Sequence, residues 1–229
     1  ITEVEKRAVR DSAEQAGAKE VYLIHEPMAA AIGIGIDVEE PVGNMIIDIG
    51  GGTTGITVIA LAGIVCDQSI RIAGDEFTAD IMEALRRYHS LLIGERTAEQ
   101  IKIQVGAAMK DLDNPPADIP VNGREVGTGT PKQVMVSYQE VAEALDKSIF
   151  KIEEAILKAL ETTPPELAAD IYRRGLYITG GGALLRRLDK RSTNKIKLPV
   201  HVADDPLKSV VRGTGIALKN YDRFPFVMR

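Results

Sequence analysis

The sequence of 229 residues contains one cysteine and three histidines. It also lacks an apolar run long enough for a membrane-spanning helix, which needs about 18 residues. Because Cys66 stands alone, no disulfide can form within the chain, and a reducing cytosol is the expected compartment. His25, His89 and His201 are scattered without the spacing typical of metal ligands. These absences argue against a disulfide scaffold, a histidine metal centre and a helical membrane protein.

Excess positive charge is absent as well. Lys and Arg number 28 against 33 Asp and Glu, which gives a net charge of −5 at pH 7. Nucleic-acid-binding proteins normally present a basic face, so we expect no nucleic-acid partner. Hydrophobic residues make up 45% and charged residues 27% of the chain, the balance of an ordinary globular protein. The length suffices for one large domain or two small ones.

The sequence does contain two clusters of three glycines, each preceded by an apolar, strand-like run. The first lies in residues 48–55 (DIGGGTTG), between the β-rich segments 45–47 and 56–61, a pattern typical of a β-hairpin. Glycine allows a close approach of backbone to ligand, and successive N–H groups in such a turn can bind an anion. One cluster is equally compatible with a plain hairpin turn. A second cluster, residues 179–183 after the strand-like run 176–178, favours a pair of phosphate-binding turns.

Asp48 stands at the end of the incoming strand of the first cluster. The neighbouring Ile46, Ile47 and Ile49 indicate that the position is buried, and a buried acid needs a partner. Asp48 could hold a hydrated Mg²⁺, because this ion keeps most of its waters and binds few carboxylates. The hydroxyl of Thr53 would add a donor to the same turn.

Periodicity and capping patterns predict the other elements. Capping boxes are expected at residues 2–5, 97–100 and 137–140, and Asp75 is expected to cap a further helix. The predicted helices are 2–16, 28–34, 75–88, 97–109, 137–160, 164–174 and 205–218. The further predicted strands are 21–24, 63–72, 119–121, 134–136 and 200–202. Asn122-Gly123 is a turn signal after the strand 119–121. Strands that meander beside helices predict an α/β fold with a mixed sheet flanked by helices, and the irregular region near residues 111–137 predicts a small α+β satellite subdomain.

Three segments together resemble the actin/chaperone/sugar-kinase ATPase superfamily: residues 25–33 (HEPMAAAIG), 48–54 (DIGGGTT) and 179–185 (TGGGALL). Their order and spacing are most similar to the MreB family of bacterial actin-like proteins, and the resemblance covers essentially the whole chain. It implies an actin-like (ribonuclease H-like) fold. Residues 1–73 and 137–229 would form the larger nucleotide-binding lobe and its C-terminal helix, and residues 74–136 the satellite subdomain.

The chain departs from the family in one respect. The family's first phosphate loop, an Asp-x-Gly-Thr hairpin near the N-terminus, is not found in this sequence. We therefore expect the chain to be a fragment without the N-terminal lobe. The full-length protein would be an ATPase whose hydrolysis is linked to polymerisation, and that activity would be impaired in the fragment.

The resemblance also assigns roles to single residues, with ATP and Mg²⁺ as the expected cofactors. Glu26 would be the catalytic glutamate that orients water, although a helix-end acid favoured by the helix dipole is the simpler alternative. Asp48 would be the residue associated with Mg²⁺. Glu99 and Lys102 would belong to the base and ribose pocket, or else form an ordinary solvated pair. The full nucleotide-binding set is Gly50, Gly51, Gly52 and Thr53 (second phosphate loop), Glu99, Gln100, Ile101 and Lys102, and Gly180, Gly181, Gly182, Ala183 and Leu184 (adenosine motif).

The function that the resemblance implies is that of a cytoplasmic protein at the inner face of the cell membrane. It would form dynamic membrane-associated filaments that determine rod cell shape by organising cell-wall synthesis. Its partners would be further copies of itself, cell-wall elongation and membrane proteins, and the inner membrane surface through the missing N-terminal part. Two alternatives from the same superfamily stay open here. One is a DnaK-type chaperone ATPase, which would need a β-rich peptide-binding domain; the other is a small-molecule kinase, which would need a substrate pocket in the first lobe.

Overall fold

The computed structural model describes residues 2–228, and its larger part is built on a five-stranded sheet of order β3-β2-β1-β7-β8. β1 (Asn44–Ile49), β2 (Thr54–Ala60) and β3 (Gly63–Ile70) form an antiparallel meander. β7 (Leu176–Thr179) and β8 (Val200–Val202) continue the sheet parallel to β1. The sheet is therefore mixed, which confirms the predicted fold class.

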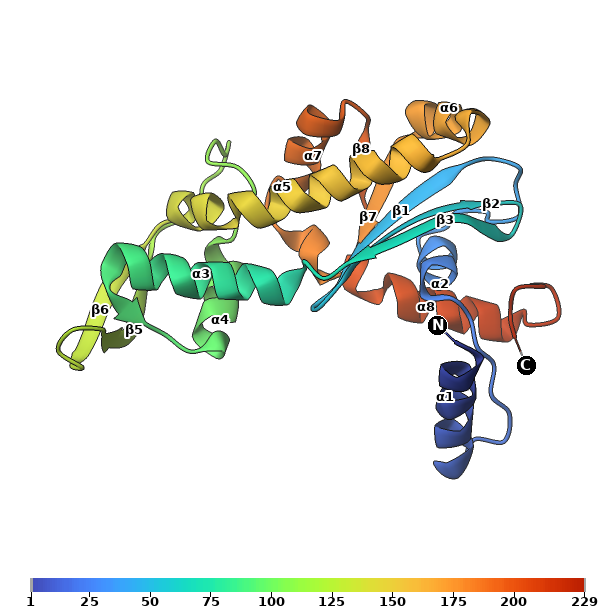
Figure 1. The fold of residues 1–229 in the computed structure, drawn as a ribbon, viewed down its shortest axis with the longest axis horizontal. Helices are drawn as coiled ribbons and strands as arrows, with labels where there is room; N and C mark the ends of the chain where they lie inside the picture. Colours follow the sequence, from blue (N-terminus) through green and yellow to red (C-terminus); the bar gives the residue numbers. More distant parts are fainter. Residues whose placement is uncertain (1, 229) are drawn as a thin grey trace.

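Helices cover both faces of β1 and β2, which explains why nearly every residue of these two strands is buried. Side chains alternate between the faces of a strand. Ile47 and Ile56 accordingly belong to a core that includes α5 (Tyr138–Thr162), whereas Ile46 and Ile59 belong to a second core with α2 (Glu26–Gly33) and α8 (Ser209–Lys219). Figure 1 shows α5 above the sheet, and α2 and α8 below it.

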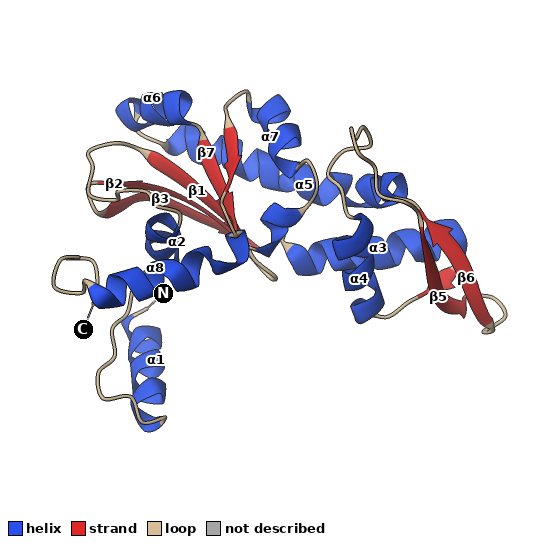
Figure 2. Cartoon of the chain, turned by 180° about the vertical axis from the view of Figure 1, so that it is seen from behind, coloured by secondary structure: helices blue, strands red, loops and turns tan. Residues whose placement is uncertain are grey.

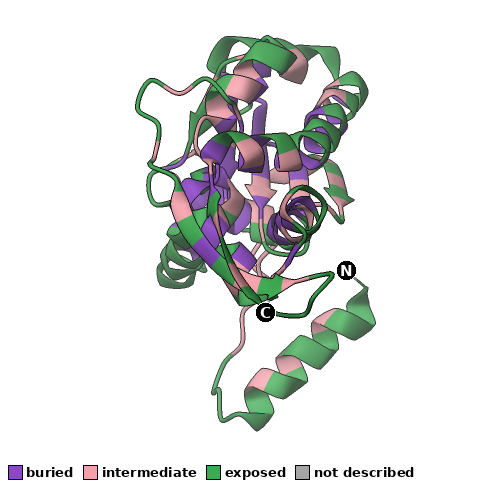
Figure 3. Cartoon of the chain, turned by 90° about the vertical axis from the view of Figure 1, so that its left-hand side faces the viewer, coloured by how far each residue is buried: buried purple, intermediate pink, exposed green. Residues whose placement is uncertain are grey.

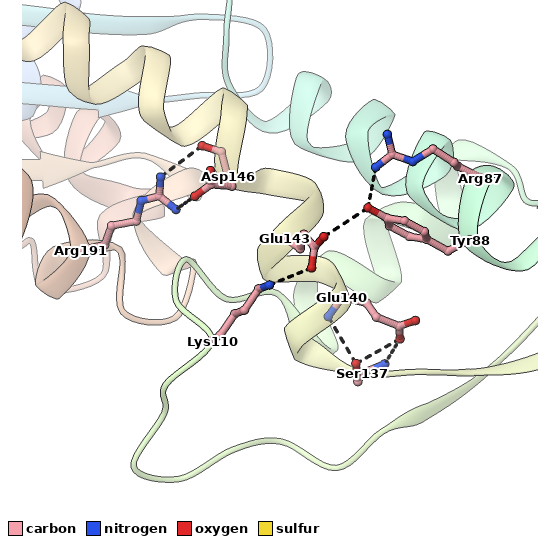
Figure 4. Close-up of polar contacts among 8 residues, drawn as sticks. All are labelled: Arg87, Tyr88, Lys110, Ser137, Glu140, Glu143, Asp146 and Arg191. Carbon is pink, nitrogen blue, oxygen red and sulfur yellow. Dashed lines mark hydrogen bonds and ion pairs between the residues drawn. The ribbon is translucent and has the colours of Figure 1, made fainter.

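The 25-residue helix α5 connects the two ends of the molecule. Its capping box forms as predicted, with the Ser137 side chain and Glu140 bonding reciprocally. Its predicted apolar stripe is buried at Val141, Leu145, Ile149, Ile152 and Ile156. Polar contacts fix its flanks: Arg191 of α7 (Leu188–Ile196) bonds to Asp146, and Glu143 accepts from Lys110 at 2.7 Å (Figure 4). α6 (Pro165–Arg174) follows α5 as predicted and ends at Gly175, whose φ is +80°.

A second, three-stranded antiparallel sheet of order β4-β5-β6 lies at the opposite end from the large sheet (Figure 2). It consists of β4 (Leu91–Leu92), β5 (Ile119–Glu125) and β6 (Pro131–Val136), with α3 (Gly74–His89) and α4 (Glu95–Val105) beside it. All of these elements fall within the range 74–136 predicted for the satellite subdomain. One continuous core nevertheless contains Ile47, Phe77 and Val121, so the boundaries of the subdomain stay a prediction.

The first helix, α1 (Glu3–Gln15), projects away from the rest of the molecule. Its capping box between Thr2 and Glu5 forms as predicted, but it has no buried residue. Figure 3 shows this exposed helix below the packed body. No helix among residues 2–228 combines the length and apolarity required to cross a membrane.

Four local predictions were wrong. Asp75 is not an N-cap, because α3 begins at Gly74 with Ala73 as its cap. The box at residues 97–100 does not form, because α4 begins earlier, at Glu95, and ends at Val105. Asn122 and Gly123 pair with Gln133 and Lys132 within β5 rather than forming a turn. Residues 21–24 contribute only the isolated bridge Leu23–Met228.

Candidate functional site

The first glycine turn is tied to the start of α3. Gly50 N–H donates to the Thr53 carbonyl at 3.0 Å, which closes the turn. Gly74 N–H donates to the Gly50 carbonyl at 3.0 Å, and Asp75 N–H to the Gly51 carbonyl at 2.8 Å. Because these bonds occupy the carbonyl groups, the turn is fixed while Gly51, Gly52 and Thr53 remain exposed.

The second glycine turn lies beside the first because β7 pairs with β1 in parallel, with Asp48 opposite Thr179. Gly180 has φ +82°, and a Cβ there would overlap Asp48 Oδ1 and the Ile49 carbonyl oxygen. A Cβ on Gly182 would overlap Ile49 Cγ2. Glycine is therefore required at both positions because this turn packs closely against β1. Of the three glycines, only the middle one, Gly181, is exposed.

A cavity of about 650 Å³ opens between the two turns and α4. Seven of the residues predicted from the sequence line it: Gly50, Gly51, Glu99, Lys102, Gly181, Gly182 and Leu184. The structure adds six lining residues that the sequence reasoning missed as site residues: Gly74, Asp75, Phe77, Ile103, Leu185 and Leu207.

Lys102 is the organising cation of this cavity, and its side chain is only 15% exposed. Its ammonium donates to the Gly74 carbonyl at 2.7 Å and to Thr78 Oγ1 at 3.1 Å, and it forms an ion pair with Glu99 at 2.6 Å. Partial burial alone would raise the pKa of Glu99, but hydrogen bonds from Lys102 and Thr78 outweigh it and lower that pKa. The pair is thus part of a network between α3 and α4, not an ordinary solvated pair.

Aliphatic side chains form another wall of the cavity. Ile103, Leu184 and Leu207 are each more than half exposed (67%, 57% and 66%), although all three line the same hollow. Leu207 belongs to the 3₁₀ turn η2 (Pro206–Lys208) and Leu184 to η1 (Gly181–Leu184). Apolar side chains beside a few polar groups are typical of a small-molecule site. The sequence signal for Ile103 was its place next to Lys102, on an otherwise polar helix face.

Asp48 lies where the two turns meet, on β1. Burial, and to a smaller extent the charge of Glu26, raise its pKa to about 6. Asp48 makes no ion pair within residues 2–228, and no cluster of three potential metal-ligating side chains occurs in that range. A single partly buried carboxylate without a counter-charge fits one hydrated cation, and not a dedicated all-protein metal cage. Glu26, the first residue of α2, is exposed and close enough to Asp48 to affect its titration.

The remaining predicted residues are not among those that line the cavity. Ile101 and Ala183 are buried in the core, and Gln100 is exposed on α4. Gly52 and Thr53 are at the tip of the first turn, and Gly180 packs against Asp48. Their roles stay predictions.

Comparison with known proteins gives consistent matches. A family model described as "MreB/Mbl protein" matches residues 1–225. The chain is 48% identical over 225 residues to the "Cell shape-determining protein Mbl" of Bacillus subtilis (strain 168), covering 98% of this chain and 67% of that protein. It is 49% identical over 221 residues to the "Cell shape-determining protein MreB" of Escherichia coli (strain K12), covering 96% and 63%. The chain thus spans about two thirds of the length of these relatives.

Solved structures match in the same way. MreB5 of Spiroplasma citri bound to ADP superposes with a TM-score of 0.93 at 38% identity, covering 97% of this chain and 67% of that one. The same protein bound to AMPPNP gives the same TM-score and identity. A MamK double helical filament matches with a TM-score of 0.68 at 25% identity, covering 87% of this chain and 59% of that one.

Proposed function

Because this chain belongs to the MreB/Mbl family, we propose that it binds an adenine nucleotide in the cavity between its two glycine turns and assembles with further copies of itself. One observation carries the proposal: two glycine turns, from β1 and β7, face a single cavity that Lys102 also lines. Phosphate groups need exposed backbone donors, a ribose needs polar groups, and the base needs an apolar wall. The lining residues supply these features.

The two turns have different tasks in this proposal. Gly51 and Gly52 offer an exposed backbone to the phosphates, since a Cβ on either would have only Asp75 as a near neighbour. In this proposal the nucleoside lies against Gly181, Leu184 and Leu207. The base and ribose are bordered by Glu99 and Lys102. Asp48 would hold Mg²⁺ through its waters, and that ion supplies charge neutralisation of the phosphates when bound.

We propose that Glu26 orients the attacking water. Glu26 is exposed at the start of α2 and lies near Asp48, so its carboxylate is accessible to accept a hydrogen bond from water. Phosphoryl transfer depends mainly on positioning and charge stabilisation. ATP hydrolysis is therefore the reaction we propose for the site, with Glu26 as its catalytic residue.

At the level of the cell, we propose a filament that determines rod shape, in line with the names of the relatives. It would act in the cytoplasm at the inner face of the cell membrane, together with cell-wall elongation and membrane proteins. Nucleotide state would set assembly, because ATP would favour polymerisation and hydrolysis would follow it. Membership of the family does not favour a DnaK-type chaperone or a small-molecule kinase.

Two experiments test the proposal. Calorimetric titration of the 229-residue chain with ADP and with GDP, with and without Mg²⁺, should detect binding of the adenine nucleotide; no binding would contradict the assigned cavity. Assembly and turnover are tested in what we call the extended protein: these 229 residues together with the segment that corresponds to the remaining third of the relatives. It should sediment as polymer with ATP, and polymer that forms equally well without nucleotide would contradict the proposed coupling.

A further inference from the structure

The short helix α2 carries Glu26 at its first position but has little of its own to fix it in place. It spans eight residues and has no side-chain hydrogen bond at its N-cap, His25. Such a short helix is marginal in isolation, because few hydrogen bonds offset the cost of nucleation. The direction in which Glu26 points must therefore be set by what packs against α2.

The C-terminal helix α8 contacts α2 as closely as two backbones can approach. A Cβ on Gly33 would overlap the carbonyl oxygen of Ser209, and a Cβ on Gly213 would overlap that of Ala29. Arg212 adds a hydrogen bond of 3.2 Å from Nη1 to the Gly33 carbonyl, at the C-terminal end of α2. Figure 1 shows α2 held between the large sheet and α8.

The tail that follows α8 holds the segment that leads into α2. Leu23 and Met228 exchange two backbone hydrogen bonds, of 2.8 and 2.9 Å. The rings of Tyr22 and Tyr221 pack with their centroids 4.9 Å apart. Phe224 is buried in the core that α2 and α8 share. The tail therefore packs against the segment that leads into α2, and its backbone pairing lies two residues before His25.

We propose that residues 209–228 position Glu26. Gly213 sets how closely α2 lies to α8, and the Leu23–Met228 pairing sets where the chain enters α2. Gly213 is thus a positioning residue that acts through Glu26, although the two residues are far apart in sequence. This inference rests on the proposed role of Glu26 in ATP turnover.

Gly215 provides a matched control for the close contact between Gly213 and α2. Gly213 and Gly215 are both on α8, but a Cβ on Gly215 would meet nothing within 4 Å. Gly213→Ala and Gly215→Ala therefore change helix propensity alike, and only the first forces α2 to move. In the extended protein, Gly213→Ala should lower the turnover number at saturating ATP by about 10²-fold, the cost of a misplacement near 1 Å. Its ATP affinity should change less than threefold, and Gly215→Ala should behave as wild type.

A double-mutant cycle with Glu26→Ala separates positioning from general destabilisation. If Gly213 acts through Glu26, Gly213→Ala should cost no further turnover in the Glu26→Ala background. Undiminished turnover in Gly213→Ala, or an equal loss in both backgrounds, would overturn the inference while leaving the proposed function intact. Wild-type turnover in Glu26→Ala would overturn the proposed function, and this inference with it.

A second pair of variants keeps the test decisive if Gly213→Ala does not fold. Met228→Pro removes the N–H that donates to the Leu23 carbonyl, whereas Met228→Ala keeps both backbone bonds. We expect Met228→Pro to lower turnover several-fold at unchanged ATP affinity, and to speed hydrogen exchange at the Leu23 amide. Met228→Ala should do neither. Equal turnover in the two folded variants would contradict a role for the tail.

Discussion

The ammonium of Lys102 donates a 2.7 Å hydrogen bond to the carbonyl oxygen of Gly74, so a side chain of α4 holds the turn from which α3 starts. Gly74 in turn donates its N–H to Gly50 in the first glycine turn. A continuous chain of hydrogen bonds thus runs from the wall proposed for the base and ribose to the loop proposed for the phosphates. A substitution of Lys102 should therefore affect the binding of both the base–ribose end and the phosphate end of a nucleotide.

Replacing Lys102 by Met keeps its aliphatic stem but removes the charge and its donors. The Gly74 carbonyl and Glu99 then lose a partly buried, charged hydrogen-bond donor. The loss of such a hydrogen bond lowers the free energy of unfolding by about 1–3 kcal/mol. We expect ADP affinity of the 229-residue chain to fall about tenfold, which corresponds to about 1.4 kcal/mol. Titration calorimetry measures the effect, and Gln104→Met, at an exposed position of the same helix that does not line the cavity, is the control. Equal affinities in both variants would remove Lys102 from the site.

Gly51→Val tests the phosphate turn without disturbing the fold. A Cβ on Gly51 would lie 3.5 Å from Asp75 Oδ1, an ordinary contact, so the unliganded chain has room for it. The branched side chain would instead occupy the space of a phosphate, and overpacking of about 1–3 kcal/mol corresponds to about 5- to 150-fold weaker binding. Gly55→Val on β2 is the matched control, since its Cβ would meet nothing within 4 Å. Wild-type affinity in a folded Gly51→Val chain would contradict the assignment.

The sequence predicted the parts of the fold that depend on local pattern. The β1–β2 hairpin, the capping boxes at Thr2 and Ser137, and the stripe of α5 are all encoded within short stretches. The start of α4 could not be predicted in the same way. The capping box at residues 97–100 is a good local signal, but the helix starts one half-turn earlier, at Glu95, where Gly94 caps it.

Only part of the candidate site could be predicted, because local sequence patterns do not show which residues tertiary contacts bring together. Glycine clusters can be recognised in a sequence, and family resemblance supplied Glu99 and Lys102. Leu207 and Asp75 come to the cavity only through tertiary contacts, since Gly180 N–H donates to the Pro206 carbonyl beside Leu207. The sequence also could not show that Gly180 and Gly182 face β1, because a triplet of glycines does not reveal which one lacks room and which one meets a ligand.

Asp48→Asn should stabilise the unliganded chain at neutral pH. The folded state raises the pKa of Asp48 from 3.8 to about 6, first through burial and then through Glu26, so the charged form is disfavoured there. The folded state therefore binds more protons than the unfolded state between pH 4 and 6, and stability falls as pH rises through that window. Because the group is only partly buried, we expect the variant, with its uncharged amide, to be more stable than wild type by about 1–2 kcal/mol above pH 6.

The measurement is urea unfolding at pH 7.5 and at pH 4, with the exposed Asp222→Asn as the control. Near pH 4 the stability difference should shrink towards zero, because the wild-type carboxyl is then protonated in the folded state. A variant that is less stable than wild type at pH 7.5 would show that the carboxylate has a favourable partner in the unliganded fold.

Glu26→Ala separates the chemistry of the site from its binding. Glu26 is exposed at the N-terminal end of α2, so two explanations compete: orientation of water, or a favourable interaction with the helix dipole. A residue that acts mainly in the transition state lowers turnover more than affinity when it is lost. We expect the extended protein with Glu26→Ala to bind ATP almost normally, to hydrolyse it about 10²-fold more slowly, and to form longer-lived polymers.

Glu76→Ala is the control that makes this comparison decisive. Glu76 is likewise an exposed acid in the first turn of a helix, α3, but its charge acts on Asp80, whereas the charge of Glu26 acts on Asp48. Removing a helix-end acid costs about 0.3–1 kcal/mol, so both variants should lose a similar, small amount of stability in a melting experiment. Only Glu26→Ala should also slow phosphate release at saturating ATP. If both variants keep wild-type turnover, Glu26 is a helix-end acid and the water-orienting group lies elsewhere in the protein.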